Sequence, residues 1–294
     1  MASPRTRALR ESILVPAVFG MAAIGRYIPL PAGRMLGRFM GRLAWNVLRR
    51  YRIKALAHIT IAFPEWPEWK REETIREMFE HFGVSFFELL WLRNLTPARL
   101  AETTIIDGAE NVRAALASGK GAIGITGHCG NWEWCAATIA TVAPMTVLQR
   151  ERDEAKLNEF ITDFRAAFGI ETIDRGSGSS ARAMFQALRR NRLLAFLLDQ
   201  NIRAESVKVP FFGRPALTPI GPARIAIRAG APIVPLFIER LGDGRQLVTF
   251  HAPIATSRND DPEELTARLT AIIEAQIRHA PAQWVWMHER WRER

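Results

Sequence analysis

The feature that most constrains the fold is a regular alternation of short apolar runs and longer helical patterns beyond Thr96-Pro97. The apolar runs, which predict strands, lie at 122–126, 145–149, 193–198, 207–211, 233–238 and 246–250. Helical patterns separate them at 132–140, 153–168, 179–190, 219–228 and 262–279. Such alternation is typical of a layered α/β/α domain with a largely parallel sheet. We therefore expect an α/β fold, preceded by an N-terminal helical segment.

The net charge of the chain is concentrated near its start. Residues 1–54 hold ten Arg and one Lys but a single acid, Glu11, whereas the remainder is balanced, so this segment carries the formal charge of +10. Within it, Arg34, Arg38 and Arg42 recur at four-residue spacing, and the apolar residues on the other face are Leu36, Met40, Leu43 and Val47. This pattern predicts a helix that lies in the headgroup layer of an anionic membrane. The alternative is a surface helix with a solvated basic side.

The preceding stretch, Ser12 to Leu30, is apolar but interrupted by Pro16, Gly20 and Arg26. A transmembrane helix needs about 20 consecutive apolar residues, so this stretch is short for a span. It also lacks the small-residue cleavage pattern of a secretory signal. We expect a membrane-associating segment over residues 1–54, peripheral or single-pass, and one folded domain over residues 55–294.

The central motif is GAIGITGHCGNWEW, residues 121–134, in which a buried strand runs through a glycine turn into a helix start. His128 lies at this turn, and Glu133 follows it in an H-x-x-x-x-E pattern. Open α/β sheets place their chemistry at the carboxyl ends of strands, and a nearby carboxylate can orient an imidazole. We predict that His128 is a general base and that Glu133 is its partner.

Further polar residues follow other predicted strands. Asp199, Gln200 and Asn201 follow a very apolar run, Arg150 ends another, and Arg214 lies in the stiff turn Pro-Phe-Phe-Gly-Arg-Pro. Because several strand ends meet at one edge of a parallel sheet, these residues predict a catalytic or anion-binding edge.

The two cysteines, Cys129 and Cys135, flank the central motif without a distant partner, which favours folding in a reducing compartment. A small buried thiol is the favoured interpretation of Cys129, and a nucleophile is the alternative. The chain has no H-E-x-x-H motif, and two isolated cysteines do not form a zinc site, so we expect no metal.

A stripe at three-to-four spacing runs through a helical pattern between residues 53 and 92. Its members are Met78, Phe79, Phe82, Phe86, Leu89 and Leu90. Such a stripe is most simply a core face. Its aromatic content also suits an acyl-chain groove, and both interpretations stay open.

Five motifs occur in an order that resembles a known family. They are GHCGNWEW, LQR, LLDQN, VPFFGRPALTPIGPARIAIRAGAPIVP and PAQWVWMHERW. Together they resemble the bacterial lipid A biosynthesis acyltransferases, the late lauroyl and myristoyl transferases within the lysophospholipid acyltransferase superfamily. The resemblance spans nearly the whole chain and identifies residues 55–294 as an acyltransferase domain.

The resemblance implies acyl transfer from a thioester, on acyl carrier protein or acyl-CoA, to a hydroxyl of a membrane glycolipid or lysophospholipid, with a lipid A precursor as first candidate. It implies that His128 deprotonates the acceptor hydroxyl while Glu133 holds the imidazole, with no cofactor. Backbone N–H groups at the helix start after Asn131 are candidate oxyanion donors. The predicted substrate-binding residues are Asn131, Arg150, Asp199, Gln200 and Arg214. His288 is expected to be structural.

The resemblance also implies a location at the cytoplasmic face of the cell inner membrane. A competing hypothesis is a nucleotide- or phosphate-binding α/β protein, based on the G-x-G-x-x-A pattern at 176–181. A serine-rich helix start explains the same residues. Nucleic-acid binding is disfavoured, because apolar residues alternate with the N-terminal arginines at helical spacing.

Overall fold

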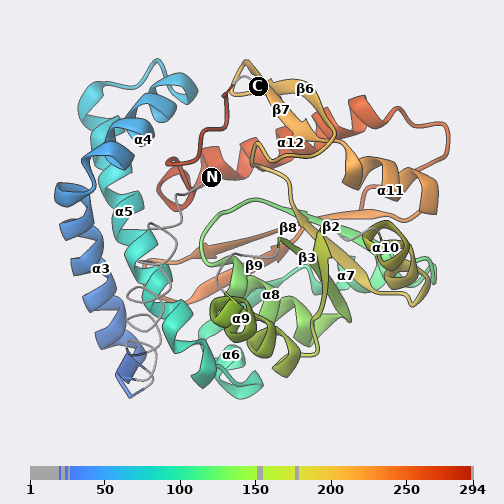
Figure 1. The fold of residues 1–294 in the computed structure, drawn as a ribbon, viewed down its shortest axis with the longest axis horizontal. Coiled ribbons are helices and arrows are strands. Elements are labelled where there is room, and N and C mark those ends of the chain that lie inside the picture. Colours follow the sequence, from blue (N-terminus) through green and yellow to red (C-terminus); the bar gives the residue numbers. More distant parts are fainter. Residues whose placement is uncertain (1–19, 21–23, 26, 151–154, 176–178, 293–294) are drawn as a thin grey trace.

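The structure is a computed structural model that describes residues 20, 24–25, 27–150, 155–175 and 179–292. Its centre is a seven-stranded sheet in the order β1-β9-β8-β2-β5-β3-β4 (Figure 1). The strands are β1 Thr104–Asp107, β2 Ala122–Thr126, β3 Met145–Arg150, β4 Glu171–Arg175, β5 Leu193–Leu197, β8 Ile233–Arg240 and β9 Gln246–Phe250, with β6 Ser206–Phe211 and β7 Arg214–Pro219 in a separate hairpin. The α-helices after residue 29 are α3 Leu30–Val47, α4 Arg49–Ala62, α5 Glu68–Trp91, α6 Pro97–Thr103, α7 Ala109–Leu116, α8 Trp132–Val142, α9 Ala155–Ala167, α10 Ser180–Arg189, α11 Gly221–Ala229 and α12 Pro262–His279.

The predicted α/β class and the largely parallel sheet are confirmed. All neighbouring strands of the main sheet run parallel except β8 and β9, which are antiparallel. Strands β1, β4 and β7 escaped the sequence prediction, because their residues are more polar or proline-rich than those of the central strands. The predicted strand at 207–211 forms the antiparallel β6–β7 hairpin rather than joining the main sheet. Its prolines lack the N–H that a central strand must donate.

The sheet divides the core into two layers, as the alternation of side chains in β8 shows. Phe237 packs in one cluster with Ile273 of α12, whereas Leu236 packs in the other with Trp134 of α8. Helices α11 and α12 therefore cover one face of the sheet, and α7 and α8 cover the other. Because successive side chains of a strand point to opposite faces, the sheet carries helices on both faces, as the predicted three-layer α/β/α arrangement requires.

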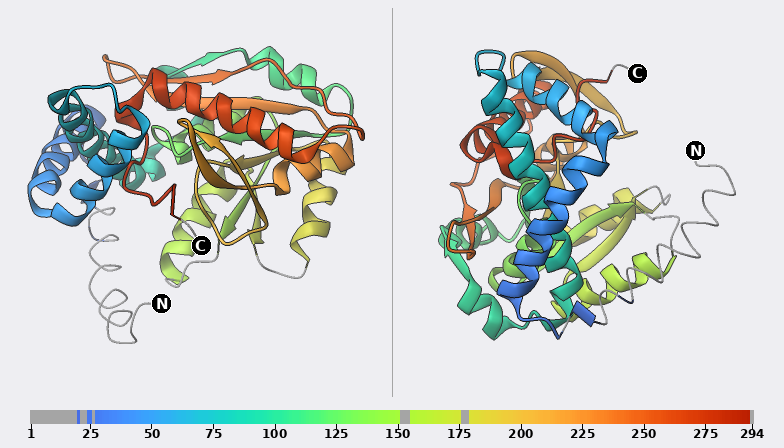
Figure 2. Two further views of the ribbon diagram at one scale, coloured as in Figure 1. Left: turned by 90° about the horizontal axis from the view of Figure 1, so that it is seen from above. Right: turned by 90° about the vertical axis from the view of Figure 1, so that its left-hand side faces the viewer.

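A further helical layer, formed by α3, α4 and α5, stands beside the sheet on the left of Figure 1, and Figure 2 shows it from above and from the side. Helix α3 packs closely against α5 through its glycines, and Trp45 near its end contacts Phe79 of α5. A Cβ added at Gly37 would lie 2.6 Å from the carbonyl oxygen of Gly83, and one at Gly41 would lie 2.2 Å from that of Phe79. The absence of side chains at Gly37 and Gly41 therefore allows the two backbones to approach closely.

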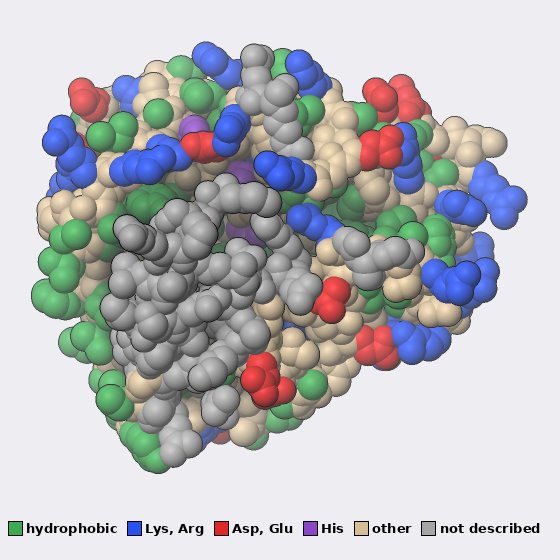
Figure 3. All heavy atoms as spheres, viewed as in Figure 1, with side chains coloured by type: hydrophobic (Ala, Val, Ile, Leu, Met, Phe, Trp, Pro, Cys, Tyr) green, Lys and Arg blue, Asp and Glu red, His purple; other side chains and the backbone are tan. Residues whose placement is uncertain are grey.

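The apolar face of α3 points outward, away from α5. Its exposed members are Met35, Leu36, Phe39, Met40, Leu43 and Val47. Figure 3 shows hydrophobic side chains along the same left-hand side of the molecule. The arginines are not simply solvated, since Arg42 and Arg38 both approach Glu80 of α5, at 2.7 and 3.6 Å. The side chains of Arg38 and Arg42 are nonetheless 58% and 62% exposed, so the membrane-associated helix and the surface helix with a solvated basic side both stay predictions.

The apolar stretch from Ser12 to Leu30 lies mostly outside the described residues. Within the ranges given above, we find no helix that combines the length and the hydropathy needed to cross a bilayer.

Replacing Gly37 with alanine should destabilise the protein, because the new methyl group would meet the Gly83 backbone, which cannot rotate away. We expect the free energy of unfolding to fall by about 1–3 kcal/mol, the usual cost of overpacking. Chemical denaturation measures this change. The matched control is Gly221→Ala at the first residue of α11, where an added Cβ meets nothing within 4 Å. Equal stability of the two variants would contradict close packing of α3 on α5.

Candidate active site

Two neighbouring strands deliver the central residues of the site. Strand β2 ends at Thr126 and β5 at Leu197, and these two residues are paired in the parallel register. His128 and Asp199 each follow two residues beyond a strand end, so they emerge together at the same edge of the sheet. The adjacency of β2 and β5 therefore brings together two residues 71 positions apart in the sequence.

Asp199 is a buried carboxylate held by three hydrogen bonds. Its Oδ1 pairs with Nδ1 of His128 at 2.8 Å, and its Oδ2 accepts from the His128 backbone N–H at 2.8 Å and from Nε1 of Trp284 at 2.7 Å. Burial by itself would raise the pKa of this carboxyl, but the nearby His128 and the donated hydrogen bonds outweigh burial and lower its pKa to about 2. Asp199 is therefore ionised at neutral pH.

The imidazole of His128 is oriented by this carboxylate. With Nδ1–H donating to Asp199, the other ring nitrogen, Nε2, carries the lone pair and is the proton acceptor. The side chain of His128 is 20% exposed while that of Asp199 is 0% exposed, so the imidazole lies between the buried anion and the outside. The Trp132 ring packs edge-on against the imidazole at a centroid distance of 5.1 Å. This arrangement suits a general base.

Glu133 lies in the first turn of α8 but does not hold the imidazole in this geometry. Its carboxylate accepts two hydrogen bonds from Arg165 of α9, at 2.6 and 3.1 Å, and Arg165 also donates to Gln149 at 2.9 Å. The direct contact with His128 that the sequence spacing predicted is made by Asp199 instead. The reason is that His128 precedes the N-cap of α8, and Gly130 between them has a φ of 54°, so helical periodicity does not relate the two side chains.

Asn131 is the N-cap of α8 and is buried. Its Oδ1 accepts from the backbone N–H of Trp134 at 3.1 Å, and its Nδ2 donates to Glu88 at 3.0 Å. Both ends of the amide are therefore engaged inside the protein, and its predicted contact with substrate stays a prediction. No hydrogen bond that the structure describes uses the N–H groups of Trp132 and Glu133, the first two of α8. These are the candidate oxyanion donors.

The other predicted binding residues have no described contact with His128. Arg150 ends β3, which pairs with β5, but its side chain lies outside the described residues. Gln200 follows Asp199 and is half-buried, and Arg214 begins β7 and is exposed. Among the contacts that the structure describes, none joins Gln200 or Arg214 to His128, so their roles stay predictions.

Cys129 and Cys135 are both buried free thiols. Burial raises the pKa of Cys129 well above its usual value, helped by the nearby Asp199 carboxylate, and burial raises the pKa of Cys135 to about 12. A thiol kept protonated is a poor nucleophile. The structure thus supports the space-filling interpretation of Cys129.

The C-terminal segment completes the site in a way that the sequence did not reveal. Trp284 donates to Asp199, and His288 accepts at Nε2 from the backbone N–H of Asn201 at 3.0 Å, which is a structural contact of the kind expected for His288. The signal was present in the motif PAQWVWMHERW, but spacing alone does not show which of its tryptophans turns inward. Arg165 and Glu88 also escaped the sequence analysis.

A small pocket shares Trp132 and Trp284 with the surroundings of His128 and Asp199. It is lined by Met78 and Phe82 of α5, by Trp132, and by residues 282–285, including Trp284. Trp132 contacts the His128 ring and Trp284 contacts Asp199, so the pocket opens beside the site. The predicted stripe of α5 is therefore divided: Phe79 and Leu90 are buried core, while Phe82 is 43% exposed.

No three His, Cys, Asp or Glu side chains within the described part of the chain gather to hold a metal ion. The G-x-G-x-x-A pattern that suggested nucleotide binding falls partly on residues 176–178, which lie outside the described residues. Its last two residues, Ser180 and Ala181, form the start of α10.

Comparisons with known proteins show what the chain is similar to. The family profile of bacterial lipid A biosynthesis acyltransferases matches residues 2–293. A phosphatidylinositol mannoside acyltransferase of Mycobacterium tuberculosis is 29% identical over 220 residues, covering 72% of this chain and 68% of that protein. The lipid A biosynthesis lauroyltransferase of Escherichia coli is 26% identical over 271 residues, covering 91% and 87%. The palmitoleoyltransferase of the same organism is 24% identical over 280 residues, covering 94% and 90%.

The match extends over almost the entire chain, and the relatives named above share a description as acyltransferases. The chain belongs to the bacterial lipid A biosynthesis acyltransferase family and is an acyltransferase that acts on an acyl donor and a lipid acceptor.

Proposed function

We propose that this protein transfers a fatty acyl chain from an acyl thioester to a hydroxyl of a membrane glycolipid, with a lipid A precursor as the first candidate acceptor and with His128 as the general base. The observation that carries the mechanism is the pair formed by His128 and the buried, ionised Asp199. The donor is a thioester of acyl carrier protein or of coenzyme A.

The chemistry follows from the orientation of the imidazole. Nε2 of His128 takes the proton of the acceptor hydroxyl as its oxygen attacks the thioester carbonyl carbon. The tetrahedral intermediate then collapses, the C–S bond breaks, and the imidazolium returns the proton to the leaving thiolate. Asp199 stabilises the imidazolium between these steps, because its negative charge lies 2.8 Å from Nδ1. A positioned base of this kind contributes about 10²–10⁴-fold to the rate.

Negative charge on the intermediate needs fixed donors. The N–H groups of Trp132 and Glu133 stand at the positive end of α8, directly after the turn that carries His128. Glu133 then serves the site through its backbone and through the ion pair that ties α8 to α9. The pocket between α5 and Trp284 is our candidate for the start of the acyl-chain groove, because most of its lining residues are apolar and one of them, Trp132, contacts the His128 ring.

Lys and Arg side chains border the histidine side chains visible in Figure 3. A positive rim of this kind favours phosphate groups, which both a phosphorylated glycolipid and a phosphopantetheine donor carry. Arg150 and Arg214 stay our candidates for these contacts.

The location that we propose is the cytoplasmic face of the inner membrane, with residues 1–54 as the membrane-associating segment and 55–294 as the acyltransferase domain. The outward apolar face of α3 supports this placement. Arg49 and Arg50 follow directly in α4 and are exposed, which favours anionic lipid headgroups.

Removal of the general base tests the mechanism. His128→Ala should lower acyl transfer by about 10²–10⁴-fold, the contribution of a positioned base. The measurement is formation of acylated lipid from radiolabelled lauroyl thioesters, with a melting curve to confirm folding. Because His128→Ala leaves Asp199 buried without its partner, His128→Asn, whose amide can still donate to Asp199, is the second variant. Most of the activity surviving in a folded His128→Asn protein would refute the base assignment.

The choice between the two carboxylates has its own test. Asp199→Asn should reduce kcat at least about tenfold more than Glu133→Gln does, since only Asp199 contacts the imidazole and a wrong ring tautomer is costly. Both substitutions preserve shape, so each is the control for the other. Steady-state kinetics with a saturating thioester donor decide the matter, and an equal or larger loss in Glu133→Gln would return the orienting role to Glu133.

The apolar face of α3 should bind membranes. The double substitution Phe39→Glu and Leu43→Glu should weaken binding to vesicles of phosphatidylethanolamine and phosphatidylglycerol by about tenfold or more, given about 1.5–3 kcal/mol for each buried large apolar side chain. Co-sedimentation measures the change. Ile106→Glu, on exposed β1, is the control that adds a charge away from α3. Unchanged vesicle binding by the double variant would exclude this face.

A further inference from the structure

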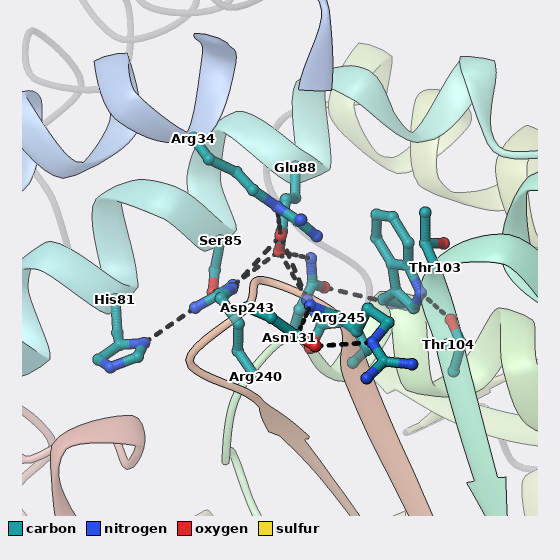
Figure 4. A network of polar contacts seen from close by, with 12 residues as sticks. Arg34, His81, Ser85, Glu88, Thr103, Thr104, Asn131, Arg240, Asp243 and Arg245 are labelled. Atoms are coloured by element: carbon teal, nitrogen blue, oxygen red, sulfur yellow. Dashed lines mark hydrogen bonds and ion pairs between the residues drawn. The ribbon is translucent and has the colours of Figure 1, made fainter. Parts of the chain in front are cut away.

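A buried carboxylate outside the site collects donors from four elements. Glu88 of α5 is 0% exposed, and Figure 4 shows the polar side chains that surround it. It accepts from Nε of Arg34 in α3 at 2.7 Å, from Arg240 at the end of β8 at 2.7 Å, and from Gln246 at the start of β9 at 3.2 Å. The fourth donor is Nδ2 of Asn131, the N-cap of α8. The mechanism above uses none of Glu88, Arg34, Arg240 or Gln246.

The bond to Asn131 links Glu88 to the catalytic turn. An amide side chain has a donating end and an accepting end, and a carboxylate can only accept. Glu88 therefore selects the orientation in which Nδ2 faces inward and Oδ1 caps the N–H of Trp134. Asn131 is the last residue of the turn that begins at His128. The fixed orientation of its amide therefore anchors this turn to the start of α8.

A second link runs through Arg240. While its guanidinium pairs with Glu88, its backbone N–H donates to Oε1 of Gln283 at 2.8 Å and its carbonyl accepts from Nε2 of Gln283 at 2.9 Å. The carbonyl of Gln283 in turn accepts from the N–H of Gly130 at 2.8 Å. Glu88 is thus connected to two of the three residues that follow His128.

The charges of this cluster are fixed at neutral pH. Burial alone would raise the pKa of Glu88, but the guanidinium groups of Arg240 and Arg34 outweigh burial and lower its pKa. Burial, with Arg240 and Arg38 nearby, lowers the pKa of His81 to about 4, so a neutral imidazole accepts from Arg240 at 3.0 Å. The carboxylate is therefore a constant acceptor and not a titrating switch.

We propose that Glu88 is a positioning residue for acyl transfer: acting through Asn131 and Arg240, it fixes the turn of residues 128–131 and with it the imidazole of His128. Glu88 itself touches no substrate atom. The inference rests on the proposed role of His128 and extends the machinery of that site to α5.

The test is a double-mutant cycle on Glu88 and Asn131. Glu88→Gln keeps the shape but can turn a donor toward the amide of Asn131, whereas Asn131→Ser keeps an N-cap and deletes the link. We expect each single variant to lower kcat about tenfold, with KM for the lauroyl thioester within about twofold of the parent, since small displacements of a catalytic group reduce the rate of the chemical step. The double variant should lose no more than either single variant, because both break the same link.

The matched control is Glu80→Gln. Glu80 lies two turns from Glu88 on the same helix and also pairs with arginines of α3, but it faces α3 at the surface. Its kcat should stay within about twofold of the parent, as expected for a site distant from the turn. All kinetics are run below the melting transition of each variant.

Three results would overturn the positioning role: a folded Glu88→Gln with the parent kcat, independent losses that multiply in the double variant, or a kcat loss in Glu80→Gln equal to that of Glu88→Gln. If Glu88→Gln does not fold, Asn131→Ser decides alone, and a parent-like kcat in that variant overturns the proposal. A parent protein that transfers no acyl chain would refute the proposed function instead, which keeps the two failures distinct.

Discussion

A buried carboxylate on the imidazole is the interaction on which the site depends. Asp199 has no exposed side-chain surface, yet three hydrogen bonds keep it ionised. An unpaired anion in such a place would be costly, and the cost is offset only because His128 and Trp284 are brought to it from distant parts of the chain. The parallel pairing of β2 with β5 and the return of the C-terminal segment are therefore both needed for the contacts that Asp199 makes with His128 and Trp284.

The protein uses buried acids in two ways. Asp199 contacts the imidazole of the proposed base, whereas Glu88 contacts Asn131, at the end of the turn that carries this imidazole, where we propose a positioning role. Both are surrounded by donors from several elements, so each ties helices and strands together as well as serving the site. A buried network of this kind is favourable only when all its members are present.

Helix α3, for which we propose membrane contact, is connected to the same network. Helix α3 presents its apolar side outward, packs through glycines on α5, and sends Arg34 inward to Glu88. The same α5 lines the apolar pocket beside Trp132. Helix α3, the pocket and the proposed base therefore lie on neighbouring elements, which is consistent with our proposal that a lipid approaches over α3.

The sequence by itself determined the α/β class, the helix at α3 and the place of His128 between a strand and a helix, because these depend on local periodicity and on the glycine turn between the two elements. It also placed Asp199 at the sheet edge, since an apolar run followed by polar residues predicts where a strand ends. Only the tertiary structure decided that Asp199, and not Glu133, meets the imidazole, and that Trp284, Arg165 and Glu88 support the site. These pairings depend on the order of the strands and on the direction of the chain through Gly130, which act over long sequence separations and leave no periodic signal.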